Sequence, residues 1–203
     1  MNEDREALIR EMSDVATIAV KIRKFLNHIA SSFSFYVYSL GVIGPFLVAK
    51  GLGEMLGGNP DYWNTGGIIL GVLIATYLHG TLLSKIVRSL GVERGASRSK
   101  YALVLFMLIF LGIGVASYLV GELVPSASNV SWYPPLAVLL LVIYLMMKSE
   151  YTFPHLVASI IMLATSPLVL YTGSIDIAIG LLLISYLIAG THSAYKALEE
   201  LGG

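Results

Sequence analysis

The feature that most constrains the fold of this chain is a series of apolar runs, each bounded by a short turn-forming cluster. Each run is about twenty residues long, and an α-helix rises ~1.5 Å per residue, so one run matches the ~30 Å hydrocarbon layer of a bilayer. A helix also satisfies its own backbone hydrogen bonds where no water is available. The sequence therefore predicts an all-α fold, a polytopic transmembrane helix bundle.

Six membrane spans are expected along the chain. They lie at about 33–56, 66–89, 101–121, 134–148, 154–172 and 174–196. Of the 203 residues, 56% are hydrophobic and only 13% are charged, which leaves too little polar surface for a water-soluble domain. We therefore divide the chain into an amphipathic helix at 1–32, cytoplasmic or interfacial, and a six-helix transmembrane domain at 33–203.

The positions of Lys and Arg predict the orientation. The loop between the second and third spans contains Arg94, Arg98 and Lys100. By contrast, the segments 57–65, 122–133 and 173–174 contain no Lys or Arg. Because positive residues are retained on the cytoplasmic side, we expect a multi-pass protein of the cell membrane with both termini in the cytoplasm.

Residues 2–30 are expected to form one amphipathic helix. Its apolar positions step alternately by four and three residues, which is a heptad repeat typical of a helix that packs against another helix. These positions, here called the apolar seam, are Leu8, Met12, Val15, Ala19, Ile22, Leu26 and Ile29. Ile18 and Phe25 broaden this face, which also suits a helix in the lipid headgroup region. We favour an interfacial or helix-docking role over free coiled-coil dimerisation.

Three partners follow from this pattern: the lipid bilayer, another protein and a second copy of the chain. The candidate docking residues are Leu8, Met12, Val15, Ile22 and Leu26 of the helix, with Arg94, Arg98 and Lys100 of the cytoplasmic loop at 91–100. Thirteen basic and thirteen acidic residues cancel, so nucleic acid is not an expected partner.

Two histidines are candidates for a polar site inside the membrane. His79 is near the middle of the second span, and His192 is toward the cytoplasmic end of the sixth. Ionisable residues within spans are often functional, and two histidines on different helices suit axial haem ligation, metal binding or proton relay. We favour the simpler interpretation, in which each neutral imidazole bonds a neighbouring hydroxyl. The neighbours are Tyr77, Thr81, Thr191 and Ser193.

A second candidate site is acidic. Glu54, Glu122 and Asp176 all fall near the predicted outer ends of their spans, where carboxylates attract cations. The alternative is that each carboxylate is simply solvated. Lys50 precedes Glu54 by one helical turn and is within its reach.

Motifs for catalysis are absent from the sequence. It contains no phosphate-binding loop of the G-x-x-x-x-G-K-[ST] type, no H-E-x-x-H and no Cys. We therefore expect no enzyme activity, no catalytic residues, no bound metal and no cofactor. Asn129-Val130-Ser131 matches a glycosylation sequon on the predicted outer side.

The layout resembles that of ABC-2-type transporter permeases. It combines an amphipathic N-terminal helix, six spans, two cytoplasmic termini and a short basic cytoplasmic loop from Arg88 to Lys100. The resemblance implies an export subunit energised by a separate ATPase, whose nucleotide-binding subunit contacts this loop. Two alternatives stay open: a non-enzymatic scaffold of a secretion, pilus or respiratory assembly, supported by the apolar seam, and a b-type cytochrome-like subunit that uses His79 and His192.

Overall fold

Helices make up the whole described fold, as predicted. The computed structural model describes residues 2–89, 101–147 and 152–202, with side chains at 10–60, 62–81, 111–146 and 152–202. The elements are α1 (Asn2–Leu56), α2 (Pro60–Ser89), α3 (Tyr101–Leu123), the 3-10 helix η1 (Pro125–Val130), α4 (Tyr133–Met147), α5 (Phe153–Thr172) and α6 (Ile175–Gly202). Within these ranges the structure has no strand.

Fewer helices than predicted qualify as membrane spans. Among the described residues, three are long and apolar enough to cross a bilayer: α1 from Arg10 to Leu56, α5 and α6. The predicted number was six. The difference has a physical cause in α4, which has 15 residues and so rises only ~22 Å. The part of α3 with described side chains, Leu111–Leu123, is shorter still.

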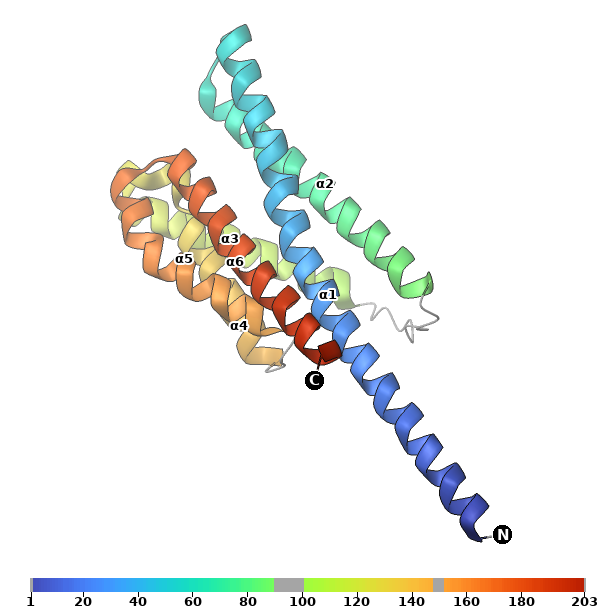
Figure 1. The fold of residues 1–203 in the computed structure, drawn as a ribbon. Helices are drawn as coiled ribbons and strands as arrows, with labels where there is room; N and C mark the ends of the chain where they lie inside the picture. Colours follow the sequence, from blue (N-terminus) through green and yellow to red (C-terminus); the bar gives the residue numbers. More distant parts are fainter. Residues whose placement is uncertain (1, 90–100, 148–151, 203) are drawn as a thin grey trace.

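Helix α1 is the central element of the arrangement. It packs against α2 on one side and α6 on the other (Figure 1). From α6 the contacts continue to α5 and then to α4, while α3 packs against η1 and α4. The N-terminal part of α1 extends beyond the rest of the bundle (Figure 1). Helix α1 is one continuous helix of 55 residues that includes residue 32, where the sequence analysis divides the amphipathic helix from the transmembrane domain.

Glycines allow α1 and α2 to approach closely. A Cβ atom at Gly71 would lie 2.7 Å from the Cα of Val42, and one at Gly67 would lie 2.9 Å from the Cα of Phe46. These distances are to backbone atoms, which move only if the helices separate. Small residues serve this purpose in membrane helix pairs, where close packing supplies much of the association energy.

This packing predicts that alanine lowers the stability of the fold at Gly67 but does not lower it at the adjacent Gly66. Gly67→Ala is expected to lower the free energy of unfolding by about 1 kcal/mol, because overpacking outweighs the better helix propensity of alanine. Gly66→Ala is the matched control, since a Cβ there meets nothing within 4 Å. Unfolding in mixed micelles, followed by circular dichroism, measures both. Equal stability of the two variants would contradict the close contact.

The turn between α5 and α6 forms the tight hairpin that its few residues indicate. Gly173 ends α5 with φ of 60°, and its N–H donates to the carbonyl oxygen of Val169 at 3.0 Å. A Cβ atom at Gly173 would lie 2.6 Å from the carbonyl oxygen of Ser126 in η1. Glycine is therefore required here both for the left-handed backbone and for the contact with η1.

Polar contacts join the helices inside the bundle. The Ser159 hydroxyl donates to the carbonyl oxygen of Ala137 at 2.8 Å, and the hydroxyls of Tyr133 and Thr165 are 2.9 Å apart. Both contacts connect α5 to α4. They lie beside a core that includes Phe35, Phe46, Met162, Val169 and Leu182. Because each hydroxyl has a partner, these buried polar groups support the packing.

Candidate functional site

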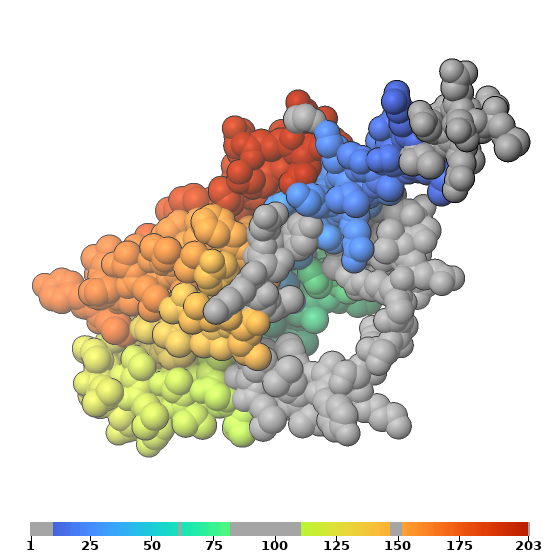
Figure 2. Space-filling model, turned by 90° about the horizontal axis from the view of Figure 1, so that it is seen from below, coloured from blue at the N-terminus to red at the C-terminus, as the bar shows by residue number. Residues whose placement is uncertain are grey.

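The most exposed part of the described fold is the N-terminal portion of α1. We call residues 10–23 the projecting segment, because every residue in this range is exposed. In Figure 2 its blue atoms lie beside the red C-terminal end of α6 and away from α5, η1 and α3. The segment joins the bundle at Lys24, whose Nζ is 3.6 Å from Oε1 of Glu200.

The apolar seam is open along the projecting segment. Met12, Val15 and Ile22 have exposed fractions of 65%, 61% and 47%. Leu26, at the base of the segment, is half-buried. The other predicted docking residues give no further test, because the side chain of Leu8 and the residues Arg94, Arg98 and Lys100 lie outside the described part of the structure.

A second stripe of α1 faces the bundle. Its buried residues also step alternately by four and three: His28, Ser32, Phe35, Ser39, Val42 and Phe46. If this stripe is continued toward the N-terminus with the same spacing, each of its positions precedes a position of the apolar seam by one residue. One residue corresponds to a rotation of about 100° around the helix axis. The seam is therefore a separate face, and the packing of α6 against α1 leaves its part from Met12 to Ile22 exposed.

Four polar contacts hold α6 against α1 and fix the base of the projecting segment. The two helices run antiparallel (Figure 1), and the contacts occur in order along them. They are Lys24 Nζ with Glu200 Oε1 at 3.6 Å, Ser193 Oγ donating to the His28 carbonyl oxygen at 2.9 Å, the Tyr36 and Thr191 hydroxyls at 3.0 Å, and Lys50 Nζ with Asp176 Oδ2 at 2.7 Å. The direction in which the segment leaves the bundle is thus set by α6.

The candidate histidines lie on the two helices that flank α1. His79 of α2 packs its ring 5.7 Å from that of Tyr38, and His192 of α6 packs 5.1 Å from Phe153. The two imidazoles have different aromatic neighbours, and their helices pack against different sides of α1 (Figure 1). Among the described residues, no three His, Asp or Glu side chains are placed to hold a metal.

Three of the hydroxyl groups named beside these histidines make hydrogen bonds within or between helices. Thr81 Oγ1 donates to the carbonyl oxygen of Tyr77, one turn earlier in the same helix, at 2.8 Å. The Thr191 hydroxyl contacts that of Tyr36, and the Ser193 hydroxyl donates to the His28 backbone. The side chain of Tyr77 is 71% exposed. Thr81, Thr191 and Ser193 therefore contribute to contacts within or between helices, and Tyr77 lies at the surface.

The three acidic candidates are placed differently from one another. Asp176 accepts from Lys50, which belongs to α1, and Glu54 is one turn further along α1. Glu122 is exposed near the end of α3, a helix that packs on η1 and α4. The Lys50 ammonium thus donates to a residue on another helix, whereas sequence distance had indicated Glu54.

The Lys50 to Asp176 ion pair is expected to contribute little stability. Its side chains are 36% and 54% exposed, and an exposed pair is screened and typically contributes under about 1 kcal/mol. A double-mutant cycle with Lys50→Ala and Asp176→Ala measures the coupling. A coupling energy above about 2 kcal/mol would show that the pair is shielded from water, contrary to its exposure.

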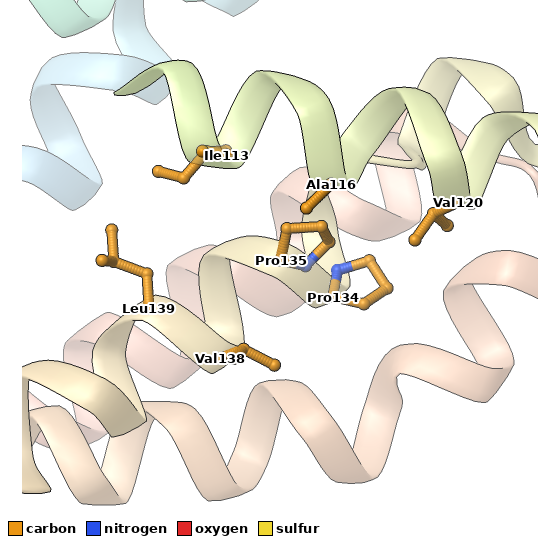
Figure 3. A pocket seen from close by; sticks show the side chains of 8 residues that line it. Ile113, Ala116, Val120, Pro134, Pro135, Val138 and Leu139 are labelled. Carbon is orange, nitrogen blue, oxygen red and sulfur yellow. The ribbon is translucent and has the colours of Figure 1, made fainter. Parts of the chain in front are cut away.

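Two hollows in the bundle are lined by apolar and aromatic side chains. The first, of about 440 Å³, lies between α3 and α4 (Figure 3). Its lining residues are Gly112, Ile113, Ala116, Val120, Pro134, Pro135, Val138 and Leu139. The second, of about 660 Å³, lies between α1 and α2 and includes Pro45, Tyr62 and Trp63. No charged side chain lines either hollow within the described structure.

Sequence reasoning missed the residues that attach the projecting segment to the bundle. Glu200, Ser193 and Asp176 all contact α1, although they are 126 or more residues away from their partners in sequence. A partial signal existed, because Lys24 and Lys50 lie toward the two ends of the first predicted span, where a cation often pairs with a carboxylate. The identity of that partner depends on the neighbour relation of α1 and α6, which no spacing in one sequence reveals.

Comparisons of this chain with protein-family models, with curated proteins and with solved structures give no match.

Proposed function

We propose that this chain is the membrane subunit of a multi-protein assembly and that it docks a cytosolic partner on its apolar seam. The observation that carries the proposal is the exposure of Met12, Val15 and Ile22 on a helix that continues directly into the bundle. Burying apolar surface contributes ~25 cal/mol per Å², and contiguous exposed apolar residues often mark interaction sites. A continuous helix also transmits the position of a bound partner to the membrane part.

The ion pairs between α1 and α6 support a position for the bilayer. Lys24 and Lys50 are 26 residues apart on α1, a rise of ~39 Å. This exceeds the ~30 Å hydrocarbon layer and is slightly less than the ~40–45 Å of a whole bilayer. Both ion pairs then lie among the lipid headgroups, where charged groups remain hydrated. Residues 2–23 extend ~33 Å from the cytoplasmic surface.

Six crossings and two cytoplasmic termini complete the proposed topology. Helices α2 and α3 have 30 and 23 residues, so they rise ~45 Å and ~35 Å and are long enough to span. Helix α4 is shorter than the hydrocarbon layer, and local thinning of the bilayer accommodates such a helix at modest energetic cost. The Lys and Arg distribution supports the orientation.

An export permease energised by a separate ATPase is the second proposal. It is favoured by the layout of the sequence, with its basic cytoplasmic loop. The apolar linings of the two hollows give it less support, because a polar solute needs polar groups along its path. The scaffold therefore accounts for more of the described geometry than the permease does.

Isolation of the intact complex separates the two proposals. The tagged chain is extracted from its native membrane in mild detergent, and the mass of the complex is measured with and without ATP. We expect a large complex that persists without nucleotide. Co-purification of an ATPase whose turnover depends on this chain would support the permease instead. A chain that migrates alone under all extraction conditions would contradict the docking proposal.

A further inference from the structure

We infer that the partner on the apolar seam is an amphipathic helix that runs antiparallel to α1 and carries its charges in the opposite spatial order. This inference rests on the proposed docking function and specifies the chemistry of the partner. It follows from the charges on and beside the projecting segment. The far end is mainly acidic, with Glu3, Asp4, Glu6, Glu11 and Asp14 against Arg5 and Arg10, while Lys21, Arg23 and Lys24 follow toward the bundle.

Two of these charges lie next to the seam. Glu11 immediately precedes Met12, and Arg23 immediately follows Ile22, so both flank seam positions on the helix surface. Both residues are exposed in the structure. In packed helix pairs, the flanking charges select the partner and its orientation more than they add affinity. A matching partner therefore carries a basic residue beside Met12 and an acidic residue beside Ile22.

The direction of the partner follows from the helix dipole. Helices are stabilised by acidic residues in the first turns and basic residues in the last turns. A partner with acidic residues near the membrane and basic residues away from it has its N-terminus near the membrane. It consequently runs antiparallel to α1, because the N-terminus of α1 is the end that lies far from the membrane.

A second copy of this chain matches this surface less well. Two copies inserted the same way in one bilayer present their projecting segments in parallel. Glu11 and Asp14 of one copy then lie at the same distance from the membrane as Glu11 and Asp14 of the other copy. The same holds for Arg23 and Lys24. Like charges at one level oppose pairing. The charge order thus favours a different chain over a homodimer.

A synthetic helical peptide tests the inference with the full chain in lipid nanodiscs. The peptide has a heptad stripe of leucines, glutamates in its first two turns and lysines in its last two. A second peptide of the same composition has glutamates and lysines intermixed. We expect the ordered peptide to bind about tenfold more tightly, as two or three exposed charge pairs allow, and expect the difference to vanish at high salt. Equal affinities at low salt would overturn the inferred charge order.

Orientation provides the second readout. The chain contains no Cys, so Ser13→Cys introduces a single labelling site on the face opposite the seam. Energy transfer from this site is expected to be stronger to the C-terminus of the bound peptide than to its N-terminus. The reverse result would overturn the antiparallel direction. In the double variant Glu11→Lys/Arg23→Glu, the preference for the ordered peptide is expected to disappear.

The outcomes separate this inference from the docking proposal. If both peptides bind equally and Val15→Asp removes the binding of both, the seam docks helices but does not select charge order. If neither peptide binds, and the isolated native complex also lacks any partner, the docking proposal itself fails. If the chain alone forms dimers that Val15→Asp dissociates, the second copy is the occupant and the inference is wrong.

Discussion

Replacing Val15 and Ile22 together by aspartate is expected to weaken binding of the cytosolic partner at least about 100-fold. Each side chain lies on the apolar seam and is largely exposed in the free chain. In the complex, each aspartate would bury a charge against apolar surface without a partner, which costs several kcal/mol at the centre of an interface. The measurement is recovery of the partner with the tagged chain, followed by titration of the purified components.

The matched control places the same two charges on another face. Ser13 and Val20 are also seven residues apart and exposed, and they point away from the seam. Ser13→Asp/Val20→Asp is expected to leave partner binding within about twofold of the unchanged chain, because surface substitutions outside a contact have small effects. Both double variants should have the same free energy of unfolding as the parent, since neither pair of residues packs in the bundle. Equal loss of binding in the two variants would show that charge alone, rather than the seam, controls docking.

Gly190→Leu is expected to lower the free energy of unfolding by about 3 kcal/mol. Gly190 is buried where α6 crosses α1, and a Cβ there would lie 2.9 Å from Cε1 of Tyr36 and 3.3 Å from Cβ of Phe35. The ring of Tyr36 has some freedom to move, whereas Cβ of Phe35 is fixed to the backbone of α1. Leucine adds three further carbon atoms beyond Cβ, so the two helices must separate.

The control for this variant is Gly180→Leu on the same helix, where a Cβ meets nothing within 4 Å. We expect that variant to retain the stability of the parent. A cross-link between Lys24→Cys and Glu200→Cys, made with a bifunctional maleimide about as long as the two side chains that it replaces, reports the helix contact directly, because no native Cys competes. It should form readily in the parent and the Gly180→Leu background but slowly with Gly190→Leu. Equal rates in all three would mean that α6 does not depend on this contact.

The helical fold and the apolar seam were accessible from sequence because both are local patterns. A twenty-residue apolar run or a heptad repeat depends only on neighbouring residues, and the Thr172 to Ser174 turn indicates the α5–α6 hairpin in the same way. Residue 32, where the predicted amphipathic helix meets the first predicted span, lies within one continuous helix, since polar Asn27, His28, Ser31 and Ser32 are all compatible with helical backbone. His28 and Ser32 instead face the bundle.

The pairing of helices was not accessible in this way. Lys50 had Glu54 as its apparent partner because one helical turn separates them, but its ammonium donates to Asp176 after α6 packs alongside α1. The number of membrane spans is established only in part, since three described helices are long and apolar enough to cross a bilayer and six were predicted. Helix α4 has 15 residues, the same length as the predicted span at 134–148, so its shortness was already a local property of the sequence.

Cysteine accessibility along α1 tests the central claim, that one helix crosses the bilayer and continues into the cytoplasm. Met12 and Val48 are 65% and 63% exposed in the isolated structure, so only the membrane distinguishes them. In inverted membrane vesicles washed free of peripheral proteins, we predict rapid reaction of Met12→Cys with a membrane-impermeant maleimide and almost no reaction of Val48→Cys until detergent is added. Similar rates for both without detergent, or labelling of Met12→Cys only in intact cells, would contradict the account.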